Sequence, residues 1–102
     1  MATTWNLNNV KVYNTLDGNS DVIYLVNYNV TATDGNGNVY ALSKEATIDT
    51  SSITDFVPFA DLTEADVLGW VETELGTEGV AAIDQEAENA LNDMLNTSIK
   101  TL

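Results

Sequence analysis

The sequence has no cysteine, no histidine and no arginine among its 102 residues. Without cysteine, neither disulfides nor thiolate metal sites can support the fold. Without histidine, the chain lacks the commonest general base, the commonest transition-metal ligand and the usual pH switch. Without arginine, bidentate phosphate recognition is excluded, because the only basic side chains are Lys11, Lys44 and Lys100. We therefore expect no enzyme, no cofactor, no metal site and no nucleic-acid partner.

The chain is instead strongly acidic, with 16 acids and a formal net charge of −13. The acids concentrate between Asp61 and Asp93, where no basic residue is found. Such a surface repels nucleic acid and anionic membranes alike. Three interpretations stay open: solubility, complementarity to a basic partner surface, or mimicry of the nucleic-acid phosphate backbone. No apolar run is long enough for a membrane span and no signal peptide is evident, so we expect no membrane partner.

The length and the order of the patterns predict one α+β domain over residues 1–102. Apolar and polar residues alternate over 22–33, as in a strand. Turn residues at 17–19 and 34–38 separate this strand from a weaker one over 5–13 and from a third over 38–48. The apolar phase of the first strand changes between Leu7 and Val10, which predicts a bulge. Residues 1–49 should therefore form a three-stranded antiparallel meander.

The second half predicts helices after a connection over residues 50–61. Pro58 stops the preceding segment, Thr63 can serve as N-cap, and Asp66 can complete a capping box. The first helix is expected from Glu64 to Leu75, with Gly76 just past its end. The second is expected from Glu78 to near Asn96. The positions it should bury are Val80, Ile83, Ala87, Leu91 and either Met94 or Leu95. Because only two residues separate the helices, residues 62–102 should form a helical hairpin packed on the sheet.

Two candidate chemical sites have simpler interpretations. Residues 34–38 begin like a calcium loop and Glu45 falls at its twelfth position, but Val39 stands where such a loop needs glycine, so a hairpin turn is favoured. Carboxylates two apart on a helix, such as Glu72 and Glu74, point about 200° apart and do not converge on one substrate. Both observations favour a protein that acts through its surfaces.

The candidate interface residues lie around the predicted start of the first helix and on the sheet. Pro58, Phe59, Gly69 and Trp70 should fix the helix start and any interface, with the Trp70 ring mainly in the core. Glycine inside a helix costs about 1 kcal/mol relative to alanine, so Gly69 predicts a close approach of another backbone. On the middle strand, Ile23 and Leu25 make the second sheet face apolar too. One helical hairpin cannot cover both faces, so we expect another protein to cover the second.

One segment carries a resemblance to a known family. Residues 56–71 match the pattern F-x-P-[FY]-x-D-L-T-E-x-x-V-x-G-W-V. In this pattern the chain resembles a family of small proteins of tailed bacteriophages, many of them phages of marine bacteria, including cyanophages, whose function is uncharacterised. The resemblance implies a virion structural or accessory protein, made in the bacterial cytoplasm and bound in multiple copies to capsid or tail proteins. The alternatives are an acidic nucleic-acid mimic that inhibits a host protein and, with less support, a small-ligand binding module.

Overall fold

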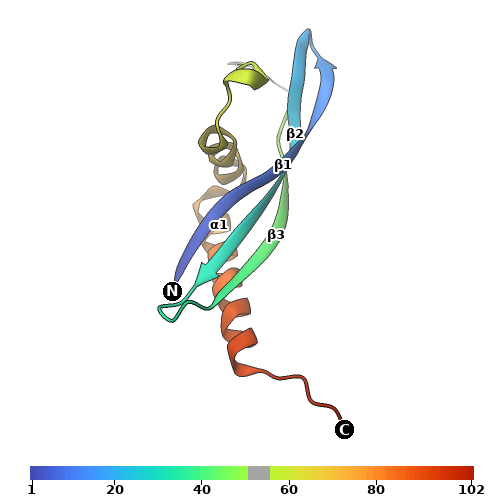
Figure 1. Ribbon diagram of the computed structural model, residues 1–102. Helices are drawn as coiled ribbons and strands as arrows, with labels where there is room; N and C mark the ends of the chain where they lie inside the picture. The colour runs from blue at the N-terminus through green and yellow to red at the C-terminus, as the bar shows by residue number, and fades with distance from the viewer. Residues whose placement is uncertain (51–55) are drawn as a thin grey trace.

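The computed structural model describes residues 1–50 and 56–102, which form a three-stranded antiparallel sheet with one long helix packed on one face (Figure 1). The strands β1 (Ala2–Leu16), β2 (Asn19–Thr33) and β3 (Val39–Thr47) lie in the order β1-β2-β3. A short 3₁₀ turn, η1 (Phe59–Asp61), precedes the helix α1 (Glu64–Asn96). The α+β class and the meander are confirmed. Residues 51–55 of the predicted connection lie outside the described residues.

Both predicted turns join neighbouring strands. At the first, Asp17 and Gly18 have φ angles of 50° and 81°. At the second, the Asp34 carboxylate accepts the backbone N–H groups of Asn36 and Asn38, at 2.8 and 3.0 Å, and the Asn38 side-chain amide at 2.9 Å. The side-chain hydrogen bond from Asn38, followed by the backbone bond from Asn36, lowers the pKa of Asp34. This carboxylate therefore closes a hairpin, as the sequence predicted.

Two bulges change which residues of the sheet face the helix. The pairing of β1 with β2 shifts register between Leu7 and Asn9, where the sequence predicted a bulge. It shifts again beside Lys11 and Val12, which pair with Leu25 and Ile23, and this second bulge was not predicted.

The second bulge corrects the expected face of Ile23. Ile23 and Val26 both belong to the helix-side core, although three residues apart in a regular strand would place them on opposite faces. The skipped Tyr24 stacks instead on Tyr13, with ring centroids 4.3 Å apart.

The core lies between β2 and α1. Its buried members on the middle strand are Val26, Tyr28, Val30 and Ala32, and those on the helix are Val67, Val71, Ala87 and Leu91. The Trp5 ring of β1 stacks on Tyr28 with centroids 5.2 Å apart. Burial, and then the charge of Glu86, raises the pKa of the Tyr28 hydroxyl.

The opposite face of the sheet is mainly polar rather than apolar. Asparagine pairs connect the strands there: the amides of Asn8 and Asn29 exchange hydrogen bonds of 2.9 and 3.0 Å, and Asn27 donates to Asn9 at 2.6 Å. Ser43 adds a further bond to Asn29. An antiparallel sheet with one such face can remain open to water. The expected need for a protein covering the second face is therefore not supported.

The predicted helix start is confirmed. The Thr63 hydroxyl accepts the backbone N–H of Asp66 at 3.2 Å, and the Asp66 carboxylate accepts the backbone N–H of Thr63 at 3.0 Å. Of the first predicted helix, Val67 and Val71 are buried and Leu68 and Leu75 are half-buried, all packed on or within the core. The helix therefore begins where the capping residues indicate.

The structure does not show the predicted helical hairpin. One helix continues to Asn96 and is interrupted only at Gly76, where φ is 73° and ψ is 170°. The chain resumes the helix at once and follows the long strands instead of reversing (Figure 1). Met94 and Leu95, expected in part to be buried, are 44% and 43% exposed because the end of α1 extends past the sheet. No helix within the described residues is long and apolar enough to cross a bilayer.

Candidate interaction site beside the helix start

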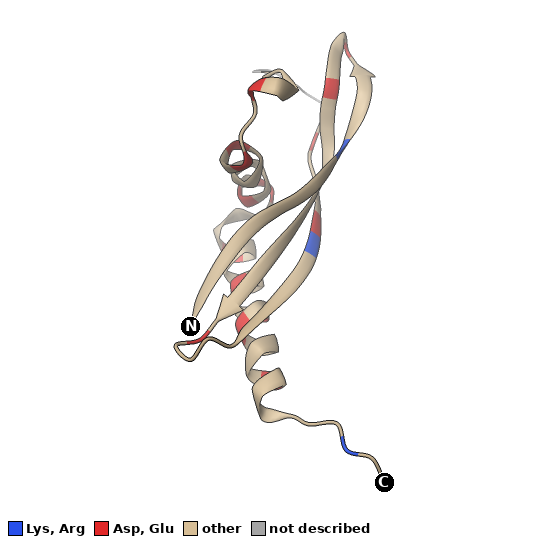
Figure 2. Cartoon of the chain, viewed as in Figure 1, with Lys and Arg blue, Asp and Glu red and all other residues tan. Residues whose placement is uncertain are grey.

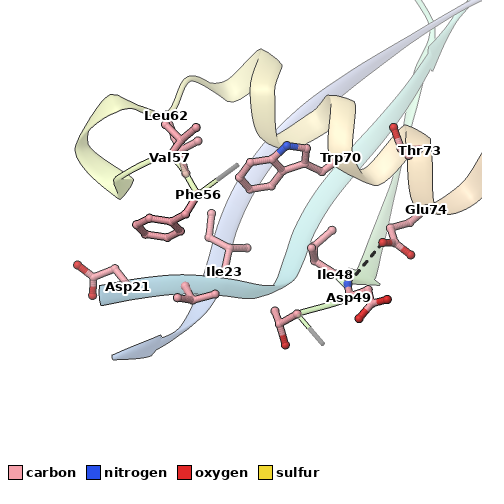
Figure 3. A pocket seen from close by; sticks show the side chains of 12 residues that line it. Asp21, Ile23, Ile48, Asp49, Phe56, Val57, Leu62, Trp70, Thr73 and Glu74 are labelled. Carbon is pink, nitrogen blue, oxygen red and sulfur yellow. Dashed lines mark hydrogen bonds between the residues drawn. The ribbon is translucent and has the colours of Figure 1, made fainter. Parts of the chain in front are cut away.

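A cavity of about 310 Å³ opens between the beginning of β2, the segment that follows β3 and the first turns of α1 (Figure 3). The residues that line it are Asp21, Val22, Ile23, Ile48, Asp49, Thr50, Phe56, Val57, Leu62, Trp70, Thr73 and Glu74. Five of them, from Phe56 to Trp70, Leu62 included, or directly beside the helix start, come from the segment 56–74. The site therefore depends on how that segment meets the sheet.

The cavity wall is mostly apolar and aromatic. The second bulge places Ile23 in the wall, and the backbone N–H of Ile48 bonds to the Tyr24 carbonyl at 2.9 Å, which holds Ile48 nearby. On the other side, the Trp70 indole and the Phe56 ring both lie along the cavity (Figure 3). Leu62, next to the capping Thr63, completes this wall.

Carboxylates surround this apolar wall. Asp21, Asp49 and Glu74 are all lining residues, whereas no lysine is among the described residues that line the cavity. The Glu74 carboxylate accepts the backbone N–H of Asp49 at 3.4 Å, so it is directed towards the sheet (Figure 3). Asp21 has a positive φ of 54° at the start of β2. The site thus combines an apolar surface with a concentration of negative charge.

Exposed apolar side chains adjoin the cavity along the chain. Val57 is 39% exposed and Phe59 is 46% exposed, and Pro58 between them is exposed as well. The backbone N–H of Asp61 bonds to the Pro58 carbonyl at 2.9 Å, which forms the turn that presents these residues. We call Val57, Pro58 and Phe59 the lip of the cavity.

The structure brings only some of the predicted interface residues together. Trp70 and Ile23 meet in the cavity wall, where Ile23 is 5% exposed, and Pro58 and Phe59 lie in the lip. Leu25 is half-buried and pairs with Lys11 elsewhere on the sheet. Gly69 does not fulfil its predicted role: within the described part of the chain, no atom of another segment lies within 4 Å of the position its Cβ would take.

Sequence reasoning missed the acidic side of the site. Asp21 and Glu74 were treated as turn and surface residues, and nothing in their local spacing indicates that they share one cavity. Phe56 had a signal, because it is the first residue of the recognised pattern. Within residues 1–50 and 56–102, no group of acidic side chains is arranged to hold a metal ion.

A second polar contact, far from the cavity, was also missed. One oxygen of Asp84 accepts the Trp5 indole N–H at 2.7 Å and the Thr3 hydroxyl at 2.9 Å, which fastens β1 to α1. Nearby, Lys44 and Glu86 form an ion pair at 2.7 Å. The periodicity of the helix gives no sign of either partner, because both contacts join distant segments.

The acidic residues follow the helix rather than the sheet (Figure 2). Those of 61–93 that are exposed are Asp61, Glu64, Asp66, Glu72, Glu74, Glu78, Glu86 and Asp93. The molecule therefore has one strongly negative side and one nearly neutral side.

The comparisons with known proteins give a family and no activity. No curated protein and no solved structure matches the chain. A family model described as "Domain of unknown function (DUF7936)" matches residues 1–101. Since the match covers almost the whole sequence, the chain belongs to the DUF7936 family.

Proposed function

We propose that this protein is a non-enzymatic structural or accessory protein of a tailed-phage virion that binds a capsid or tail protein. The observation that carries the proposal is the position of the recognised pattern. Residues 56–71 supply both the lip and, through Phe56, Leu62 and Trp70, one wall of the cavity. The segment that resembles phage proteins is thus also the segment that presents apolar surface.

The physical properties of this end of the molecule suit protein binding. Interfaces tend to centre on aromatic residues that insert into pockets and exclude water. Phe59 is nearly half exposed beside a cavity that contains two further aromatic rings. Burying apolar area stabilises a complex by about 25 cal/mol per Å² before the costs of association. The lip therefore provides a contact that the isolated chain leaves unused.

The proposal is tested by quantitative mass spectrometry of density-purified particles of the phage that encodes the chain. We expect the chain in the particles at a fixed ratio to the major capsid protein or to a tail protein. A ratio near that of the capsid protein supports a capsid position, and one that matches a tail ring supports a tail position. Presence in the lysate with absence from clean particles would refute the proposal.

A pair of matched variants tests the lip itself. Phe59→Ser should reduce the amount of the protein in particles several-fold, because it removes an exposed aromatic contact. Val39→Ser is the control, since Val39 is 54% exposed but lies at the start of β3. Equal incorporation of the two variants would show that the lip is not the contact surface.

A nucleic-acid mimic is the alternative, and the exposed acids along α1 favour it (Figure 2). This function requires tight binding to a basic host protein that weakens steeply as salt is raised. The two functions differ in outcome, since a mimic has no reason to remain in purified particles. Binding lost with neutralised helix acids but kept with Phe59→Ser would favour the mimic.

A further inference from the structure

We propose that the cavity receives an arginine side chain of the partner protein, an inference that rests on the proposed function and adds the chemistry of its contact. Three properties of the cavity point to this occupant: its size, its aromatic wall and its surrounding carboxylates.

The size fits a single side chain. Ligand pockets typically measure about 300–1,000 Å³, and this cavity of about 310 Å³ is at the lower limit. It is open to solvent beside the lip, so a side chain that projects from a protein surface can enter while Phe59 contacts the surface around it. An extended backbone or a large cofactor would exceed this space.

The lining fits a side chain with an apolar stem and a cationic head. Ile23 and Ile48 offer apolar surface against which methylene groups can pack. The Trp70 and Phe56 rings offer faces on which a planar guanidinium stacks favourably. Asp21 and Glu74 supply negative charge, and a guanidinium can make paired hydrogen bonds to a carboxylate. Arginine satisfies all three requirements in one side chain.

The occupant must come from another kind of protein. The chain has no arginine, so a second copy cannot supply one. Of its lysines, Lys44 is paired with Glu86 and Lys11 lies on β1 opposite Leu25. Charge complementarity points the same way, because a molecule of net charge −13 repels its own copies. The partner is therefore a protein that presents an arginine on its surface.

The test uses the whole purified chain and a small probe, Nα-acetyl-arginine amide, at low salt. Binding is followed by NMR through the Trp70 indole N–H and the methyl groups of Ile23 and Ile48. We expect saturable shifts at these groups. The neutral isostere Nα-acetyl-citrulline amide should bind at least fivefold more weakly. Equal binding of the citrulline compound, or no shift at these groups at tens of millimolar arginine probe, would overturn the proposal.

Isosteric variants separate the cavity from the general negative charge. Asp21→Asn and Glu74→Gln should each weaken binding of the probe by about two- to fivefold, the effect of losing one exposed ion pair. Asparagine tolerates the positive φ of Asp21, so the fold is expected to persist. Glu72→Gln removes the same charge from an exposed helix position outside the lining and should leave the affinity unchanged. An equal loss with Glu72→Gln would refute specific binding.

The two proposals fail separately. Probe binding in the cavity together with absence from particles would overturn the virion function but leave the arginine site. Presence in particles without probe binding would overturn the arginine site alone.

Discussion

Asp84 is the residue whose removal tests the fold most directly. Its single oxygen accepts hydrogen bonds from Trp5 at 2.7 Å and from Thr3 at 2.9 Å. A hydrogen bond to a charged group contributes about 1.5–3 kcal/mol. Because both bonds share one oxygen and are only partly buried, we expect Asp84→Ala to lower the free energy of unfolding by about 2–3 kcal/mol. For a chain of this length, a loss of 2 kcal/mol lowers Tm by about 8–16 °C.

The assay is urea unfolding followed by circular dichroism and tryptophan fluorescence. Glu72→Ala is the matched control, since it removes an exposed acid from the same helix and reports the effect of charge alone. Trp5→Phe keeps an aromatic ring opposite Tyr28 but loses the N–H donor. If Trp5 and Asp84 interact, the effects of Trp5→Phe and Asp84→Ala will be less than additive, with a coupling energy of about 1 kcal/mol. A loss below about 0.5 kcal/mol in Asp84→Ala, or full additivity, would refute the reasoning.

Three further changes have opposite or pH-dependent outcomes. Gly76→Ala should destabilise by about 1–3 kcal/mol, because its φ of 73° and ψ of 170° suit only glycine, whereas Gly69→Ala should stabilise by up to about 1 kcal/mol; urea unfolding compares them, and a common sign contradicts the backbone assignment. Burial, and then Glu86, raises the pKa of Tyr28 above 10, so the folded state keeps its proton longer and stability should fall as pH rises above 10. Tyr28→Phe should flatten that fall in urea midpoints, and an unchanged slope contradicts it. Hydrogen bonds within its turn lower the pKa of Asp34 below 3.8, so the stability it contributes is present above that pH and is lost as pH falls through the folded pKa; Asp34→Ala should lessen the acid loss, and an identical acid limb speaks against the turn.

Local patterns predicted much of the fold. Alternation identified the middle strand, turn residues located both hairpins, and the phase change between Leu7 and Val10 located a bulge. The capping box at Thr63 and Asp66 is a local interaction, so the sequence contains all of it. These features depend on residues within a few positions of one another, which is why a single sequence reveals them.

The features that failed depend on contacts between distant segments. Nothing near Tyr24 indicates the second bulge, so Ile23 was assigned to the wrong face and a second apolar surface was inferred. The same holds for Gly76, where a positive φ fits both a reversal and a single interruption. Strands of 15 residues provide the length along which a continuous helix can pack, and that choice is made by tertiary packing.

The candidate site was predictable only in part. The recognised pattern contains Phe56, Pro58, Phe59 and Trp70, which the structure places around or beside the cavity. Its acidic members come from the start of β2 and the third turn of the helix, and only the folded chain brings them together.

The order of the elements has a consequence during synthesis. The two hairpins pair segments that are adjacent along the chain, whereas Thr3 and Asp84 are 81 positions apart. Ribosomes add about 5–20 residues per second, so roughly 3–12 s separate the making of Ala32 from that of Leu91. During this interval the apolar side of the newly paired strands has no helix of its own to cover it. We expect the nascent chain to be most prone to aggregation or to capture by a chaperone in those seconds, and the C-terminal half of α1 to end that period.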